Sequence, residues 1–125
     1  MPKLVLALAA LAVLALPAVS RGQAVAQVTT VEIDAAKVPA YLAGLKKIEP
    51  IIKKYSSSAS MRVWHSTVAG PNSNRLSVVV EFANLAAYAE ANRFTSDPEY
   101  QKLVREFEGM GRKIVSVSLL SDVTP

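Results

Sequence analysis

Apolar side chains recur along this chain with two different spacings, and the spacing predicts which segments are strands and which are helices. A spacing of two residues with β-branched composition is typical of strands, whereas spacings of three and four residues are typical of amphipathic helices. The predicted elements are, in order, a strand at 27–34, a helix at 38–55, strands at 60–68 and 76–82, an interrupted helix at 85–109 and a strand at 112–123. We therefore expect an α+β domain in which each helical stretch connects two strands.

The first predicted helix is strongly amphipathic but contains two prolines. Its apolar face is formed by residues three or four positions apart, namely Val38, Tyr41, Leu42, Leu45, Ile48, Ile52 and Tyr55. Pro39 fits the first turn, where a missing N–H group costs no hydrogen bond. Pro50 falls inside the pattern and removes one intrahelical hydrogen bond, so we expect a kink or a break near Ile48.

The two middle strands are predicted to pair antiparallel, because only a short turn separates them. Residues 60–68 alternate between two sets of side chains, and residues 70–74 have the Gly, Pro, Asn and Ser composition of a turn. The following strand contains Val78, Val79 and Val80, which would place apolar side chains on both faces of the sheet. We therefore expect the sheet to be covered on both sides.

The second helical stretch is predicted to consist of two pieces. Asn84 is a good N-cap for the first piece. Asp97 disfavours helical backbone because it precedes Pro98, and Pro98 suits the first position of a new helix. Ser96 and Glu99 have the spacing of a capping box, which makes Ser96 a candidate cap for the second piece.

The N-terminal segment has the features of a secretory signal peptide. Lys3 precedes thirteen consecutive apolar residues, a run too short to span a bilayer, which takes about 20 residues. Ala24 and Ala26 form an A-x-A cleavage pattern, residues 18–20 are a second candidate, and a retained anchor is the alternative. We expect cleavage after Ala24 or Ala26, a signal peptide at 1–26, a single domain at 27–125 and a periplasmic or secreted protein.

Charge and cysteine content narrow the class of partner. The chain has a formal net charge of +4, and loss of the leader with Lys3 and Arg21 lowers this charge by two. A nearly balanced charge without a clustered basic face argues against nucleic-acid binding, and no membrane contact is expected after cleavage. The chain has no cysteine, so a domain of this size depends on its core or on association with a second copy. We therefore expect a homodimer.

Two segments within the βαββαβ order resemble a known superfamily. Residues 77–88 read Ser-Val-Val-Val-Glu-Phe-Ala-Asn-Leu-Ala-Ala-Tyr, and residues 96–103 read Ser-Asp-Pro-Glu-Tyr-Gln-Lys-Leu. Together with the element order they resemble the dimeric α+β barrel superfamily, and within it antibiotic-biosynthesis-monooxygenase-like and NIPSNAP-like domains. The resemblance implies a ferredoxin-like fold with a four-stranded antiparallel sheet and two helices on one face. It also implies a dimer in which the other faces of two sheets meet.

The superfamily includes cofactor-independent oxygenases, haem-degrading enzymes, isomerases and domains without known activity, so the resemblance selects no single reaction. The only histidine, His65, lies on a predicted strand, whereas haem-degrading relatives are expected to use a helical histidine. One histidine, scattered carboxylates and no thiols form no recognisable metal site. We therefore expect neither a cofactor nor a bound metal.

Three residues are candidates for catalysis. Histidine is the side chain best suited to proton transfer near neutral pH, so His65 could act as a general base, with Tyr88 or Glu81 assisting. Glu81 lies in a valine-rich strand, where burial would raise its pKa and suit it to proton transfer. The alternatives are a rim or interface histidine and an edge carboxylate paired with Arg62 on the neighbouring strand.

Four further residues are candidates for the wall of a ligand pocket. Tyr41, Asn92 and Tyr100 come from the predicted helices and could face the sheet, and Trp64 could cover an apolar cavity. The alternative for each is ordinary packing.

We expect an exported dimeric domain that binds a small apolar or aromatic molecule between helices and sheet. The alternatives are a cofactor-independent monooxygenase or isomerase, and a structural or partner-binding domain whose core is filled.

Overall fold

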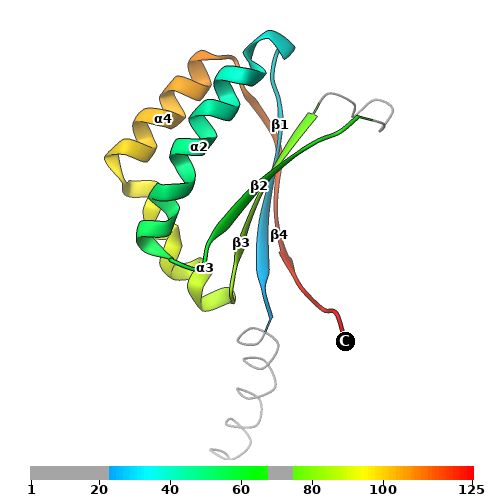
Figure 1. The fold of residues 1–125 in the computed structure, drawn as a ribbon, viewed down its shortest axis with the longest axis vertical. Helices are drawn as coiled ribbons and strands as arrows, with labels where there is room; N and C mark the ends of the chain where they lie inside the picture. Colours follow the sequence, from blue (N-terminus) through cyan, green and yellow to red (C-terminus); the bar gives the residue numbers. More distant parts are fainter. Residues whose placement is uncertain (1–22, 68–74) are drawn as a thin grey trace, which may run out of the picture.

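The computed structural model of the chain describes residues 23–67 and 75–125. Its elements are β1 (Val25–Glu32), a 3₁₀ turn (Ala35–Lys37), α2 (Val38–Tyr55), β2 (Ser60–His65), β3 (Arg75–Phe82), α3 (Leu85–Ala91), a second 3₁₀ turn (Asn92–Ser96), α4 (Pro98–Gly109) and β4 (Lys113–Ser121). The order is βαββαβ, as the sequence predicts (Figure 1). Most of the predicted leader and the predicted turn at 70–74 lie outside the described residues. None of the helices among the described residues has the length and apolarity that a membrane crossing requires.

The strands form one antiparallel sheet in the order β2-β3-β1-β4. The helices lie on one face of this sheet, to its left in Figure 1. The predicted α+β fold, with ferredoxin-like order and a four-stranded antiparallel sheet, is therefore confirmed. β1 is central and pairs with β3 from Val25 opposite Phe82 to Glu32 opposite Arg75. In this order β1 and β3 are the two interior strands, whereas β2 and the last strand, β4, are the edges of the sheet.

The helices and the covered face of the sheet enclose a hydrophobic core. On β3, alternate residues from Leu76 to Phe82 point into it. α2 and α4 approach closely at Gly44, where a Cβ atom would overlap with Cε1 of Phe107 and lie 3.0 Å from its Cζ. A side chain at position 44 would therefore push α4 away from α2. The other buried apolar residues are Val25, Val31, Tyr41, Leu45, Ile48, Ile51, Ile52, Ala59, Val78, Val80, Ala91, Phe94 and Leu103.

α2 continues through Pro50, so the break considered near Ile48 does not occur. Pro50 is exposed, whereas Ile51 and Ile52, the next two residues, are buried in the core. The proline ring therefore lies on the solvent side of the helix. Burial of the two isoleucines stabilises the continuous helix. This stabilisation outweighs the cost of the single hydrogen bond that Pro50 removes.

The second face of the sheet is more polar than the sequence led us to expect. Directly paired residues of antiparallel strands share a face. One row across this face consists of Arg62, Val79, Val28 and Ser118, and the next consists of Trp64, Ser77, Thr30 and Ser116. Along β3, from Arg75 to Phe82, Val79 is the only apolar residue on this face. The prediction of an apolar second face is correct at Val79 and Val28 but wrong for the face as a whole.

Exposed apolar side chains gather instead on the edge strand β4. Every residue of β4 is exposed, and Val117 and Leu120 reach 58% and 54% exposure. β4 packs mainly against β1, and the helix layer does not cover it. We call Ile114, Val115, Val117, Leu119 and Leu120 the apolar β4 strip. Val117 pairs with Thr29 of the covered face and Leu120 pairs with Ala26 of the second face, so the strip has members on both faces of the strand.

Candidate functional site

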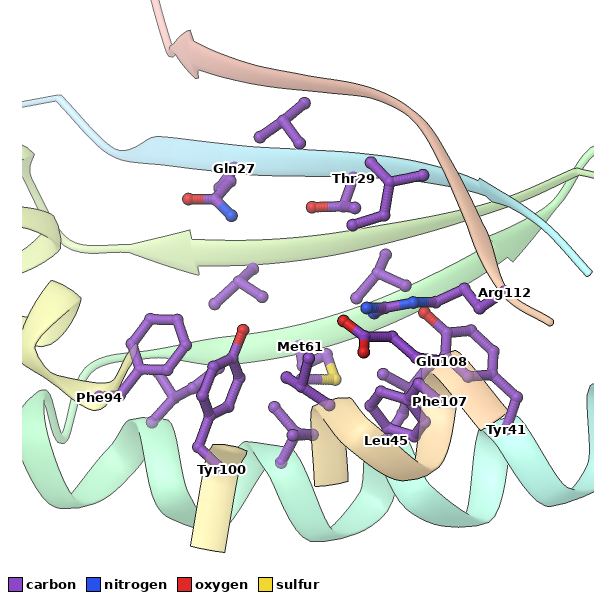
Figure 2. A pocket seen from close by; sticks show the side chains of 17 residues that line it. Gln27, Thr29, Tyr41, Leu45, Met61, Phe94, Tyr100, Phe107, Glu108 and Arg112 are labelled. Carbon is purple, nitrogen blue, oxygen red and sulfur yellow. The ribbon is translucent and has the colours of Figure 1, made fainter. Parts of the chain in front are cut away.

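A cavity of about 360 Å³ lies between the helices and the covered face of the sheet. Figure 2 shows α2 and α4 along one side of it and the strands along the other. Its apolar walls come from all these elements and consist of Leu45, Ile48, Ile52, Met61, Val78, Val80, Phe94, Val104, Phe107, Ile114 and Val117. The volume is near the lower end of the range for small-molecule sites, which is about 300 to 1,000 Å³, so the cavity suits a compact ligand.

The central strand explains why the core is not filled at this place. Gln27 and Thr29 occupy the middle of the covered face of β1, between the buried Val25 and Val31. Figure 2 shows both polar side chains pointing toward the helices. Glutamine and threonine are uncommon in a core. The sheet is thus packed tightly at the two ends of β1 and loosely between them.

Two tyrosines place their side chains in the cavity. Tyr41 comes from α2 and Tyr100 from α4, and Figure 2 shows both hydroxyls directed toward the sheet. The Tyr41 ring packs edge-on against Phe107, with ring centroids 4.8 Å apart. The Tyr100 ring packs in the same way against Phe94, at 4.7 Å. Burial raises the pKa of both hydroxyls, and the nearby Arg112 guanidinium offsets part of that rise. Both hydroxyls are therefore neutral donors at neutral pH.

Arg112 reaches the cavity from the turn between α4 and β4. Gly111 has a φ of 79°, a left-handed conformation that glycine tolerates best and that ends the helix. The Arg112 guanidinium lies over the Phe107 ring, with Cζ 5.2 Å from the ring centroid. Its Nε is buried and has no hydrogen-bond partner among residues 23–67 and 75–125. A buried donor of this kind is stabilised when an acceptor enters the cavity.

Tyr100 is positioned by a firmly anchored first turn of α4. Asp97 is the N-cap, and its Oδ1 accepts hydrogen bonds from the backbone N–H groups of Glu99 at 2.9 Å and Tyr100 at 3.3 Å. Its Oδ2 accepts from Lys54 Nζ and from the Tyr55 hydroxyl, both at 2.9 Å. Asp97 is only 6% exposed. This one carboxylate therefore joins the end of α2 to the start of α4.

The donors around Asp97 favour its charged form. The hydrogen bonds from Lys54 and Tyr55, together with those from the backbone, lower the pKa of Asp97 from 3.8 to about 2. The capping-box spacing predicts Ser96 as the N-cap of α4, and this prediction is wrong, because Asp97 is the N-cap. Ser96 belongs to the preceding 3₁₀ turn, whereas Asp97 has the extended backbone of a cap directly before Pro98.

Two of the four residues predicted for the pocket wall line the cavity, namely Tyr41 and Tyr100. Trp64 lies on the second face of the sheet, opposite Ser77, and is 60% exposed. Asn92 begins the 3₁₀ turn after α3 and is exposed. A tryptophan on the outer face of an edge strand cannot reach a cavity on the covered face, so the structure gives Trp64 no place in this pocket.

The three residues predicted for catalysis are not brought together. His65 is exposed at the end of the edge strand β2. Glu81 is exposed on the second face, borders a separate hollow of about 270 Å³, and forms no ion pair with Arg62 in the part of the chain that the structure describes. Tyr88 packs edge-on against Phe82, with ring centroids 5.4 Å apart. None of the three lines the main cavity, and their catalytic roles stay predictions.

Reasoning from the sequence missed the polar side chains of the cavity, which are Gln27, Thr29, Glu108 and Arg112. A signal existed for the first two, because they alternate with valines on one face of a strand. Arg112 follows a Gly-x-Gly turn, but only the packed structure shows that the turn directs it inward. Residues 23–67 and 75–125 contain no cluster of three or more carboxylate or histidine side chains that could hold a metal ion.

The sequence matches no protein-family model and no curated protein. Its fold is shared by solved structures. An uncharacterised NIPSNAP domain protein from Burkholderia xenovorans is 20% identical with a TM-score of 0.58, over 81% of this chain and 94% of the other. A putative antibiotic biosynthesis monooxygenase from Bacteroides thetaiotaomicron is 17% identical with a TM-score of 0.52, over 82% and 89%.

SnoaB, a cofactor-independent oxygenase from Streptomyces nogalater, is 8% identical with a TM-score of 0.60, over 82% of this chain and 95% of the other. Identities this low establish a common fold and no common activity. The resemblance to NIPSNAP-like and antibiotic-biosynthesis-monooxygenase-like domains is thus confirmed as a likeness of fold.

We expect the Asp97→Asn variant to be less stable than the wild type at neutral pH and to approach it in acid. Because the folded-state pKa lies below the unfolded value, the stabilisation is complete above 3.8 and is lost as the pH falls toward about 2. Thermal unfolding over a pH series measures this difference. Glu106→Gln, at an exposed carboxylate of α4, serves as the control and should change little. An Asp97→Asn deficit that stays constant down to pH 2 would contradict this account.

Proposed function

We propose that this protein binds a small apolar or aromatic molecule in the cavity between helices and sheet. The observation that carries the proposal is the cavity itself, with apolar walls and a few polar groups, Tyr41, Tyr100 and Arg112 among them. A limited number of polar groups within apolar walls is the usual composition of a small-molecule site. The polar middle of β1 supports the proposal further, because Gln27 and Thr29 weaken the core unless they face something other than apolar side chains.

The cavity favours binding over the two alternatives. A structural domain with a filled core is less compatible with an open-sided cavity of about 360 Å³. The monooxygenase or isomerase alternative relied on His65, Glu81 and Tyr88, and none of these lines the cavity. Binding without turnover requires only the apolar walls and polar groups that line the cavity. Catalysis through His65, Glu81 and Tyr88 would require these three side chains to lie together, which they do not in this structure.

We also propose that the protein is a homodimer. The apolar β4 strip leaves large side chains exposed along a complete edge strand, which is a liability for a monomer in water. The second face, with Val28 and Val79 among serines, has the mixed composition of many protein interfaces. Ile114 and Val117 belong to the strip and also border the cavity, so a second copy packed there would lie at its mouth.

A larger side chain in the cavity should displace the ligand. Val104 lines the cavity from α4 and is half-buried. We expect Val104→Phe to lower the affinity for naphthalene probes such as 2-naphthoate and 2-naphthamide by about tenfold or more, because its ring occupies their volume. Isothermal titration calorimetry measures the change. Val63→Phe, the same substitution on β2 outside the cavity, should bind as the wild type does. Equal loss in both variants would place the binding site elsewhere.

Charge in the apolar β4 strip should separate the two copies. We expect Leu120→Glu to raise the dimer dissociation constant by about tenfold or more, because two carboxylates would lose hydration at the interface. Sedimentation equilibrium measures the constant. Ala43→Glu adds the same charge to an exposed position of α2 and should leave it unchanged. A wild type that sediments as a monomer at every concentration rules out the dimer.

We propose further that the chain is exported and that its leader is removed after Ala24. Cleavage after Ala26 would remove Val25, which is buried and pairs with Phe82 and Ser121. Cleavage after Ala24 leaves β1 complete. When a bacterium expresses the full chain, the mass of the protein from the periplasm or medium should correspond to a mature N-terminus at Val25. Protein that stays in the cytoplasm with residues 1–24 attached contradicts export.

A further inference from the structure

Charge inside the cavity is unevenly distributed. The charged residues that line it are Arg112 and Glu108. Arg112 is half-buried with a fully buried Nε, whereas Glu108 is exposed. No ion pair joins the two side chains among residues 23–67 and 75–125. Among the described residues, the Arg112 guanidinium in the cavity therefore forms no ion pair with a carboxylate.

We infer that the ligand carries an acidic oxygen, either a carboxylate or an ionisable hydroxyl, on its apolar body, and that Arg112 binds this oxygen. The inference rests on the proposed function and names the class of molecule. The buried Nε is a donor without an acceptor among the described residues, and a ligand oxygen would supply one. A neutral apolar ligand would leave the donor unpaired and would exclude water from it as well, which is costly.

The groups around Arg112 fit an acidic oxygen better than a cation. Figure 2 shows the Arg112 side chain extending into the cavity above Tyr41. The Tyr41 and Tyr100 hydroxyls are neutral donors, since burial raises their pKa. An anionic oxygen at this place could accept from the guanidinium and from a phenol, and charge-assisted hydrogen bonds of this kind are the strong ones.

Arg112 is also held in position before a ligand arrives. The left-handed Gly111 fixes the direction of the chain, and the Arg112 backbone N–H donates to the Phe107 carbonyl at 3.3 Å. The guanidinium rests on the Phe107 ring. A side chain that is already ordered loses little conformational entropy on binding. Glu108, on the last turn of α4, also lines the cavity, and its negative charge repels an anion and so limits the affinity.

The test compares matched probes that differ only in the acidic group. We expect the wild type to bind 2-naphthoate about tenfold more tightly than the neutral 2-naphthamide at neutral pH, or to bind 2-naphthol as its anion. The first result identifies carboxylates as the class, and the second, detected by the ground-state absorbance of naphtholate, identifies phenols. Arg112→Gln should remove the preference while 2-naphthamide binding changes less than about twofold. Arg112→Lys, which keeps the charge but loses the planar fork, should be intermediate.

The control variant acts in the opposite direction. Glu108→Gln should bind 2-naphthoate more tightly than the wild type does, because it removes a negative charge from the cavity wall. The inference is overturned if the wild type prefers 2-naphthamide, or if Arg112→Gln keeps the preference for the acidic probe. Either result leaves the proposed function intact, because the cavity still binds naphthalenes. If no naphthalene probe binds the wild type, the proposed function and the inference fail together.

Discussion

The uneven cover of the sheet by its helices is the constraint on which the rest of the structure depends. α2 and α4 are drawn together at Gly44, where there is room for the Phe107 ring but not for a side chain. Helices this close form a narrow layer, and the layer leaves β4 uncovered. A wider separation would fill the space above β4 but would open the core between the helices. The cavity and the exposed apolar edge are thus two consequences of the same packing.

α4 is fixed at both ends by polar interactions, and its two ends hold two of the polar groups of the cavity. At its start, Asp97 accepts four hydrogen bonds and sets the position of Tyr100. At its end, Gly111 turns the chain so that Arg112 points inward. Apolar packing alone would allow α4 to slide along α2. The directional hydrogen bonds at Asp97 oppose this sliding and fix the position of Tyr100 relative to α2.

The fold was largely predictable from the sequence, and the site was not. Strong periodicity predicts α2 and β3, because burial of Ile48 or Val78 depends on local spacing. Tyr41 and Tyr100 follow from the same helical pattern. The position of Arg112 depends on a single left-handed glycine, and the role of Gln27 depends on β1 being the central strand, which pairing with distant strands decides. His65 and Trp64 drew attention as rare residues, yet both lie on an edge strand away from the cavity.

The proposed ligand and the proposed second copy would both contact Ile114 and Val117. Ile114 and Val117 are wall residues of the cavity and members of the apolar β4 strip. In the single copy they face water, so a ligand that covers them from inside and a partner that covers them from outside bury overlapping surfaces. Linkage requires that each event then alters the affinity for the other by the same factor. If the ligand and the partner bury complementary parts of the two side chains, binding and association favour each other. If they compete for the same part, a loaded cavity weakens the dimer, so the sign of this coupling reports which surface of β4 the partner occupies.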